Sequence, residues 1–304
     1  MNPKRFFYWA LSITGSLFVM TVLMPLAGVF VIGLVFSHFG EAPTEGENRV
    51  AVIEVEGMIL DSREIVEQLY AQADEESVKG IVLRINSPGG AVGPAQEIYH
   101  AVKNIREKKP VVASMGAVAA SGGLYVALGA SRVLCQPGTL TGSIGVIMQL
   151  PNVGKLTERL GVDMITIKSG ELKDAGNSFR SMTSTEKEYL QSTVNAAYEQ
   201  FLEAVAQSRG LAIDDVKKFS DGRVILGGQA VQLGLVDGIG DLREAAKAVF
   251  EILGQPLADG EVPELFYPME EGFTLFKDIM RSVDGISDKF FASTSARMDY
   301  RLGW

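Results

Sequence analysis

The sequence contains very little histidine and cysteine: two histidines and one cysteine among 304 residues. The single cysteine, Cys135, excludes an internal disulfide. His38 lies where an apolar N-terminal run ends and His100 lies in a predicted helix, so neither is close to a glycine-rich turn. A Ser-His-Asp triad and a zinc site of His and Cys therefore have almost no candidates. Hydrolytic chemistry would have to use Ser, Lys, Asp or Glu.

Basic residues are fewer than acidic ones, 28 against 37, so the formal net charge is -9 at pH 7. An acidic chain gains nothing from phosphate backbones, so we expect no nucleic-acid partner. The sequence has no phosphate loop of the G-x-x-x-x-G-K-[ST] type and no G-x-G-x-x-G after a predicted strand. We therefore expect the chemistry to need no metal and no cofactor.

Charged residues are missing from one long stretch, Phe6 to Phe36. About 20 apolar residues suffice to span a bilayer, so residues 1–39 are expected to form a membrane anchor. The alternative is a cleaved signal peptide, whose apolar region is shorter, whereas this run continues well past Pro25. Basic residues precede the run and acidic ones follow it. This asymmetry predicts a single-pass membrane protein with a cytoplasmic N-terminus and the rest of the chain outside the cytoplasm.

After a polar linker at 40–48, predicted strands alternate with predicted helices as far as residue 254. The predicted strands cover residues 50–56, 80–86, 111–114, 133–136, 144–149, 164–168 and 223–226. The longest predicted helices cover residues 62–73, 95–105, 183–209 and 241–253. This alternation predicts an α/β layered fold in one domain over residues 49–254.

Helix ends are marked by local signals. Thr183 and Glu186 form a capping-box pattern at the start of the longest helix, which is expected to end at Gly210. Asp241 is the expected N-cap of the last helix, with Gly254 after its end. In the tail, residues 255–304, apolar residues between 273 and 290 keep a helix-like spacing. This segment is expected to pack on its own domain, on a neighbouring subunit or on a membrane surface.

Glycine, in contrast, is abundant and gathers in four motifs. They are NSPGG at 86–90, AASGG at 119–123, TGSIGV at 141–146 and IKSGELKD at 167–174. The first two each follow a strand and open a helix, where ligands bind in α/β sheets. Taken alone, each is compatible with a simple turn or with close packing. AASGG also presents a hydroxyl at a helix start, where backbone N–H groups could hold an oxyanion.

In this order, and behind an N-terminal anchor, the four motifs resemble the signal peptide peptidase A family in its short single-domain bacterial form. The resemblance covers roughly residues 50–245. It implies a layered fold related to the Clp protease and crotonase group, a Ser-Lys dyad and a ring-shaped homo-oligomer. It also implies peptide substrates, namely cleaved signal peptides left in the lipid bilayer, with small or apolar side chains at the cut.

Matched motif by motif, the resemblance implies a role for five residues. Ser121 of AASGG would be the nucleophile and Lys173 of IKSGELKD the general base. Gly90 and Gly122 would supply the N–H groups of the oxyanion hole, and Ser143 would hold the lysine amine in place. The scarcity of histidine agrees with a base of this type.

A lysine can act as a base only when its amine is neutral. The reference pKa of lysine is about 10.4, so catalysis near neutrality requires a pKa lower by roughly 3. Burial can lower the pKa this far. The carboxylates of Glu171 and Asp174 would oppose it, and we expect them to point away from Lys173. Lys168, at the end of a predicted strand, is the other candidate base.

Three other functions use the same features. A crotonase-type acyl-CoA enzyme would share the fold and the oxyanion glycines, but it requires the opposite topology, because acyl-CoA is cytoplasmic. A non-catalytic, ring-forming membrane scaffold would keep the fold without the chemistry. A regulatory peptidase that cuts one specific membrane protein would share every motif.

Overall fold

The computed structural model describes residues 49–258, 260–268 and 298–301. The predicted anchor and linker, residues 1–48, lie outside these ranges, as does the helix-like spacing at 273–290. Of the helices within the described ranges, none is both long and apolar enough to cross a bilayer.

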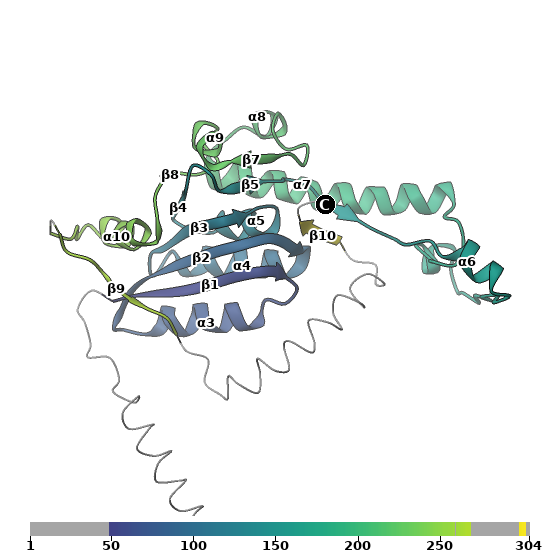
Figure 1. Cartoon of the computed structure of the whole chain (residues 1–304), viewed down its shortest axis with the longest axis horizontal. Coiled ribbons are helices and arrows are strands. Elements are labelled where there is room, and N and C mark those ends of the chain that lie inside the picture. The colour runs from purple at the N-terminus through teal and green to yellow at the C-terminus, as the bar shows by residue number, and fades with distance from the viewer. Residues whose placement is uncertain (1–48, 259, 269–297, 302–304) are drawn as a thin grey trace, which may run out of the picture. The chain divides into compact units, whose positions relative to one another are not determined.

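Six parallel strands form the main sheet, in the spatial order β9-β1-β2-β3-β4-β8 (Figure 1). They are β1 (Arg49–Ile59), β2 (Val78–Ala91), β3 (Val111–Ala119), β4 (Arg132–Cys135), β8 (Gly238–Ile239) and β9 (Glu264–Phe266). The three longest strands, β1 to β3, consist largely of buried aliphatic residues. Parallel strands require cover on both faces, so the predicted α/β layering is confirmed.

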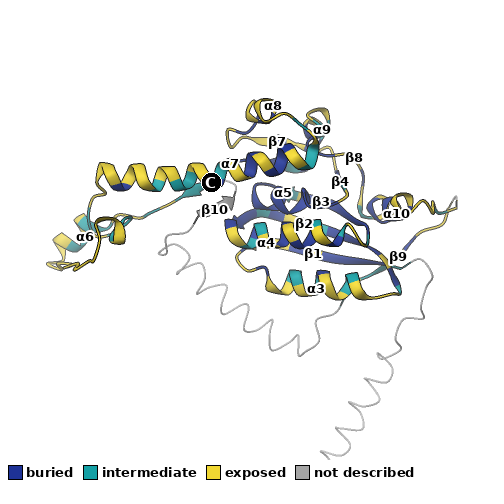
Figure 2. Ribbon diagram, turned by 180° about the vertical axis from the view of Figure 1, so that it is seen from behind, coloured by how far each residue is buried: buried dark blue, intermediate teal, exposed yellow. Residues whose placement is uncertain are grey.

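Helices provide this cover. One face carries α3 (Arg63–Asp74), α4 (Val92–Ile105), α5 (Gly122–Ala127) and α7 (Ser184–Arg209), and the other carries α10 (Leu242–Ile252). Neighbouring strand residues therefore point to opposite layers. Ile81 and Leu83 join the larger apolar cluster, whereas Val82 packs with Val249 and Phe250 of α10. Figure 2 shows the sheet as a buried layer between helices with exposed outer faces.

A smaller layer lies beside the carboxyl ends of the central strands. Here β5 (Leu140–Gly142) pairs with β3 and, antiparallel, with β7 (Val224–Leu226). The chain then passes through β6 (Ile147–Met148), α6 (Gly154–Arg159) and the short 3-10 helix η2 (Glu171–Asp174) before α7 begins. The short helices α8 (Ile213–Lys217) and α9 (Gly227–Gln232) follow it.

The predicted helix ends are confirmed. Thr183 is the N-cap of α7 in a complete capping box with Glu186, and Gly210 ends the helix with a φ of 66°. Asp241 caps α10 and accepts hydrogen bonds from two backbone N–H groups of its first turn. Gly254 follows α10 with a φ of 71°. These signals act within a few residues, so tertiary contacts do not displace them.

Three expectations about strands are wrong. No strand forms at 164–168, where Ile165 is 88% and Ile167 96% exposed, because no neighbouring strand pairs with it. The strand expected at 144–149 shortens to β6. The turn expected after Asn86 is instead a continuation of β2, since β1 pairs with it as far as Gly90.

Two strands that we did not expect come from the segment 255–304. The first, β9, extends the parallel sheet beside β1. The second, β10 (Met298–Arg301), runs antiparallel between the end of β2 and β6.

Candidate active site

Ser121 occupies the turn between β3 and α5 in an unusual state. Its φ of 53° and ψ of -116° lie outside the regions that residues with a side chain favour. Backbone strain of this kind costs on the order of 1–3 kcal/mol and clusters at functional sites. The residue is fully buried, and its Oγ has no hydrogen-bond partner. A buried hydroxyl without a partner costs further stability, so the fold holds it there against two penalties.

Two neighbouring strands, β2 and β5, hold this strained turn in place through their backbones. The Ser121 N–H donates to the Gly142 carbonyl at 2.9 Å, and the Ala120 N–H donates to the Ser87 carbonyl at 3.1 Å. A Cβ at Gly123 would lie 2.7 Å from the same Ser87 oxygen. The motifs NSPGG, AASGG and TGSIGV thus meet at Ser121.

The two proposed oxyanion glycines belong to two of these motifs, Gly90 to NSPGG and Gly122 to AASGG. A Cβ at Gly90 would lie 2.0 Å from the backbone carbonyl oxygen of Ile59, so only glycine fits between β1 and β2 at this point. Gly122 is the first residue of α5. Its N–H therefore has no acceptor within the helix. Gly122 directly follows Ser121, so its N–H is close to the proposed nucleophile, as a donor of an oxyanion hole must be.

Ser143 lies next to Ser121 in space, because Gly142 accepts the hydrogen bond of the Ser121 N–H. Its φ is 51°, and its own N–H donates to the Arg223 carbonyl at 2.8 Å. Ser121 and Ser143 are the two non-glycine residues with positive φ in the described part of the chain. The structure therefore brings Ser121, Gly122 and Ser143 together, and Gly90 lies three residues after Ser87, whose carbonyl accepts from the Ala120 N–H.

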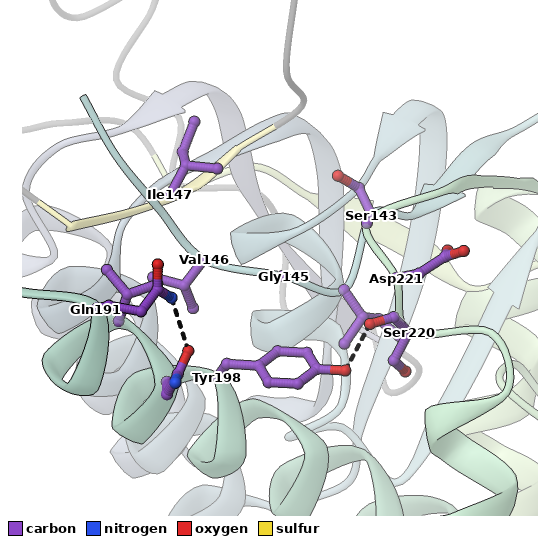
Figure 3. A pocket seen from close by; sticks show the side chains of 12 residues that line it. Ser143, Gly145, Val146, Ile147, Gln191, Tyr198, Ser220 and Asp221 are labelled. Carbon is purple, nitrogen blue, oxygen red and sulfur yellow. Dashed lines mark hydrogen bonds between the residues drawn. The ribbon is translucent and has the colours of Figure 1, made fainter. Parts of the chain in front are cut away.

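A cavity of about 460 Å³ opens beside Ser143 (Figure 3). One wall is the extended chain after Ser143, and the others come from α7 and the loop before β7. Tyr198 of α7 donates to the Ser220 carbonyl at 2.6 Å and so ties two walls together. The lining residues are Ser143, Ile144, Gly145, Val146, Ile147, Gln191, Val194, Asn195, Tyr198, Ser220, Asp221 and Gly222.

Lys173 is not part of this group. It lies on η2, where no residue is buried, and its side chain is exposed. Its amine makes no hydrogen bond or ion pair with the described residues, and the Ser121 hydroxyl is unpaired. Figures 1 and 2 both place α6 at the far end of α7, away from the sheet. One chain alone does not bring Ser121 and Lys173 together.

Lys168, the other candidate base, is engaged elsewhere. Its amine lies 2.5 Å from a carboxylate oxygen of Asp174 and 2.8 Å from the Glu171 carbonyl oxygen. Asp174 also pairs with Arg180 at 2.8 Å. The hydrogen bonds from Lys168 and Arg180 hold the pKa of Asp174 well below its usual range. Within the described ranges no ion pair joins Asp174 to Lys173, as expected from the sequence.

Sequence reasoning missed one element of the site, β10. Tyr300 is opposite Gly90 in the antiparallel pairing with β2, and Met298 is opposite Met148 of β6. An extended segment of the chain thus lies directly beside a proposed oxyanion glycine. Nothing in the local sequence predicts it, because both partner strands are distant in the chain.

Comparison with known proteins gives one consistent result. Residues 103–254 match the family described as "Peptidase family S49", and residues 48–140 match "Clp protease". A putative protease of Synechocystis is 40% identical over 212 residues, which cover 69% of this chain and 76% of the relative. A putative protease of Methanocaldococcus jannaschii is 37% identical and covers 71% and 68%, respectively. A putative signal peptide peptidase SppA of Enterococcus faecium is 35% identical and covers 65% and 61%.

Replacing the unpaired hydroxyl should stabilise the protein. We expect Ser121→Ala to raise the free energy of unfolding by about 1 kcal/mol, since it removes a buried polar group without a partner. Ser220→Ala is the matched control: this serine is equally buried, but its hydroxyl donates to the Val216 carbonyl at 2.7 Å. It should lose about 1 kcal/mol. Urea unfolding measures both, and a destabilised Ser121→Ala would contradict the interpretation.

Adding a methyl group at Gly90 should disrupt the junction of β1 and β2. Because its Cβ would overlap the Ile59 backbone, we expect Gly90→Ala to cost about 3 kcal/mol or more. Gly93, three residues later in α4, has no atom within 4 Å of its Cβ position. Gly93→Ala should therefore be neutral or stabilising by up to about 1 kcal/mol. Thermal unfolding of the two variants side by side tests this, and equal effects would refute the steric argument.

Proposed function

Because this chain belongs to peptidase family S49 and is a serine peptidase, we propose that Ser121 is its nucleophile and Lys173 its general base. The observation that carries the proposal is the state of Ser121: buried, strained and with an unpaired hydroxyl at the start of a helix. Such a hydroxyl has no competing acceptor, so its proton is available to a base brought beside it.

The proposed reaction is acyl transfer in two steps. The neutral amine of Lys173 takes the proton of Ser121, whose Oγ attacks the carbonyl carbon of a peptide bond. The N–H groups of Gly90 and Gly122 stabilise the oxyanion, and the protonated amine passes its proton to the leaving nitrogen. Water then attacks the acyl-enzyme, loses a proton to Lys173 and releases the new carboxylate, while Ser121 recovers its proton. Ser143 would orient the Lys173 amine, because it follows Gly142, whose carbonyl accepts from the Ser121 N–H.

The backbone arrangement around Gly90 supports a peptide substrate. The strand β10 is antiparallel to both β2 and β6, so the edges of these two strands accept an extended chain between them. A substrate that took the place of β10 would hydrogen-bond along its main chain, which gives affinity without sequence preference. Its carbonyl would then lie next to Gly90.

The cavity beside Ser143 supports a preference for small or apolar side chains at the cut. Ile144, Val146, Ile147 and Val194 contribute apolar wall, and a volume of about 460 Å³ is sufficient for an apolar side chain of a bound peptide.

A second copy of the chain is part of the proposal, because Lys173 must come from outside the group that holds Ser121. From residue 145 to residue 185 no residue is buried. This projecting segment, residues 145–185, nevertheless exposes large apolar side chains, with Leu160 at 69% and Ile167 at 96% exposure. Exposed apolar surface of this extent is typical of an interface. We infer that the segment docks on a neighbouring copy and supplies its Lys173 there, and a head-to-tail repetition of this contact closes a ring.

The cellular role follows from the sequence and the relatives. We propose that residues 1–39 anchor the protein in a bacterial inner membrane, with the catalytic domain outside the cytoplasm, and that it cleaves residual signal peptides or other short hydrophobic peptides. The uncharged run from Phe6 to Phe36 supports the anchor, and the name of the Enterococcus relative supports the substrate. A regulatory peptidase for one membrane protein is the alternative.

Complementation between two inactive variants tests both the dyad and its origin. Full-length Ser121→Ala and Lys173→Ala chains that carry different tags are co-expressed. They are then solubilised in detergent and treated with a serine-directed fluorophosphonate. Neither variant alone should be labelled. In the mixture the label should appear on the Lys173→Ala chain, in roughly a quarter of the sites if copies assemble at random.

The control replaces the first partner by the double variant Ser121→Ala/Lys173→Ala, which cannot donate a lysine and should give no label. Labelling of the Lys173→Ala chain on its own would refute Lys173 as the base. Labelled wild type with no recovery in the mixture would place both members of the dyad in one chain.

A further inference from the structure

Arg180 connects the turn that carries Lys173 to the start of the longest helix. Its guanidinium lies 2.8 Å from the Asp174 carboxylate and also donates to the Asp174 carbonyl at 3.3 Å. On its other side it forms two hydrogen bonds with Glu186, one of them at 2.9 Å. A planar guanidinium that contacts two carboxylates at once fixes their relative position, which an ammonium does less well.

Glu186 is the fixed end of this connection. Its side chain is 2% exposed, and it belongs to the capping box, where it accepts a hydrogen bond from the Thr183 N–H at 2.9 Å. The hydrogen bonds from Arg180, followed by that from Thr183, lower the pKa of Glu186 to about 2. The carboxylate is therefore charged at any pH at which the enzyme would work, and Arg180 keeps its partner.

Asp174 is the movable end, and it follows Lys173 directly in the chain. Lys168 holds one of its oxygens at 2.5 Å, and Arg180 and Asn177 approach the other at 2.8 Å and 3.4 Å. Both carboxylate oxygens of Asp174 thus have partners other than Lys173. Without Arg180, one carboxylate oxygen would lose its only charged partner. Lys173, the preceding residue in the chain, is a cation whose amine makes no hydrogen bond or ion pair with the described residues.

Building on the proposed function, we propose that Arg180 is a positioning residue for the reaction: it fixes the turn that presents Lys173 and keeps the Asp174 carboxylate from pairing with the Lys173 amine. An amine paired with a carboxylate stays protonated and cannot accept the Ser121 proton. The charged groups of this turn and of the start of α7 are Lys168, Glu171, Lys173, Asp174, Arg180, Glu186, Lys187 and Glu188. From the region of α6, Lys155, Glu158 and Asp163 line a pocket together with Arg180. Lys168, which pairs with the other oxygen of Asp174, helps to hold this carboxylate and does not act as the base.

The test is the pH dependence of peptide hydrolysis by full-length Arg180→Met, measured between pH 6 and pH 10. We expect the acidic limb of the rate profile to move to higher pH by about one pH unit or more, because a nearby opposite charge raises the pKa of an amine by about 1–3. At neutral pH the rate should fall by about tenfold or more, since an amine whose pKa is higher by one is neutral about ten times less often. Arg180→Lys keeps a positive charge but lacks the planar guanidinium that contacts two carboxylates, so it should move the acidic limb of the rate profile less.

Rescue distinguishes this role from a structural one. In Arg180→Met/Asp174→Asn no carboxylate remains at position 174 to capture the amine, so the acidic limb should return towards the wild-type position. The single variant Asp174→Asn should lower the rate without moving the limb to higher pH. Arg132→Met is the matched control, because Arg132 pairs with Glu251 at 2.5 Å and has a side-chain exposure of 36%, close to the 33% of Arg180. Its profile should equal that of the wild type.

An unchanged acidic limb in folded Arg180→Met, or in Arg180→Lys if the first variant unfolds, would overturn the inference, as would a double variant whose limb stays at the higher pH. Circular dichroism establishes folding in each case. These outcomes leave the proposed function standing as long as wild type hydrolyses peptides and Ser121→Ala does not. Absence of Ser121-dependent hydrolysis in the wild type would overturn both.

Discussion

The close approach of three backbone segments around Ser121, at the ends of β2, β3 and β5, is the constraint on which the rest of the site depends. Side chains are excluded at two positions of these segments: a Cβ at Gly90 would lie 2.0 Å from the Ile59 carbonyl oxygen of β1, and a Cβ at Gly123 would lie 2.7 Å from the Ser87 carbonyl oxygen. Glycine at these positions is therefore a packing requirement first. The chemical consequence is that backbone groups in fixed positions lie beside the Ser121 hydroxyl, among them the Gly122 N–H, which has no acceptor within α5. A preorganised array of dipoles of this kind stabilises a developing negative charge without having to reorganise.

This arrangement lowers stability locally and is supported by the surrounding core. Ser121 combines a backbone conformation that costs on the order of 1–3 kcal/mol with a buried hydroxyl that lacks a partner. The three central strands and the helices on both faces are fully packed around it, and they fix the ends of β2 and β3. The strain can persist because the sheet determines where those strand ends lie. This is the usual relation between a rigid α/β scaffold and an active site at the carboxyl ends of its strands.

The two residues of the proposed dyad are positioned by different kinds of interaction. Ser121 is positioned by apolar burial and main-chain hydrogen bonds, whereas Lys173 sits on a segment without a buried residue and is positioned by ion pairs. Charge pairs near the surface are weak individually, but this network ends on Glu186, which is both buried and part of a helix cap. It can therefore give the projecting segment a defined shape before a second copy covers it. An enzyme built in this way would be inactive as a single chain and would gain its base on assembly.

The α/β layering, most element positions, the helix caps and the glycine-rich segments that meet at Ser121 can be read from the sequence. These properties follow from periodicity and from signals that act over a few residues, such as the capping box at Thr183 and the glycine-rich turns. Tertiary structure alone decided where Lys173 lies, that 164–168 forms no strand, and that β10 runs beside Gly90. A strand exists only if a partner pairs with it, and a dyad only if two distant segments meet. Both depend on contacts between residues far apart in the chain, or in different chains, and no local pattern encodes them.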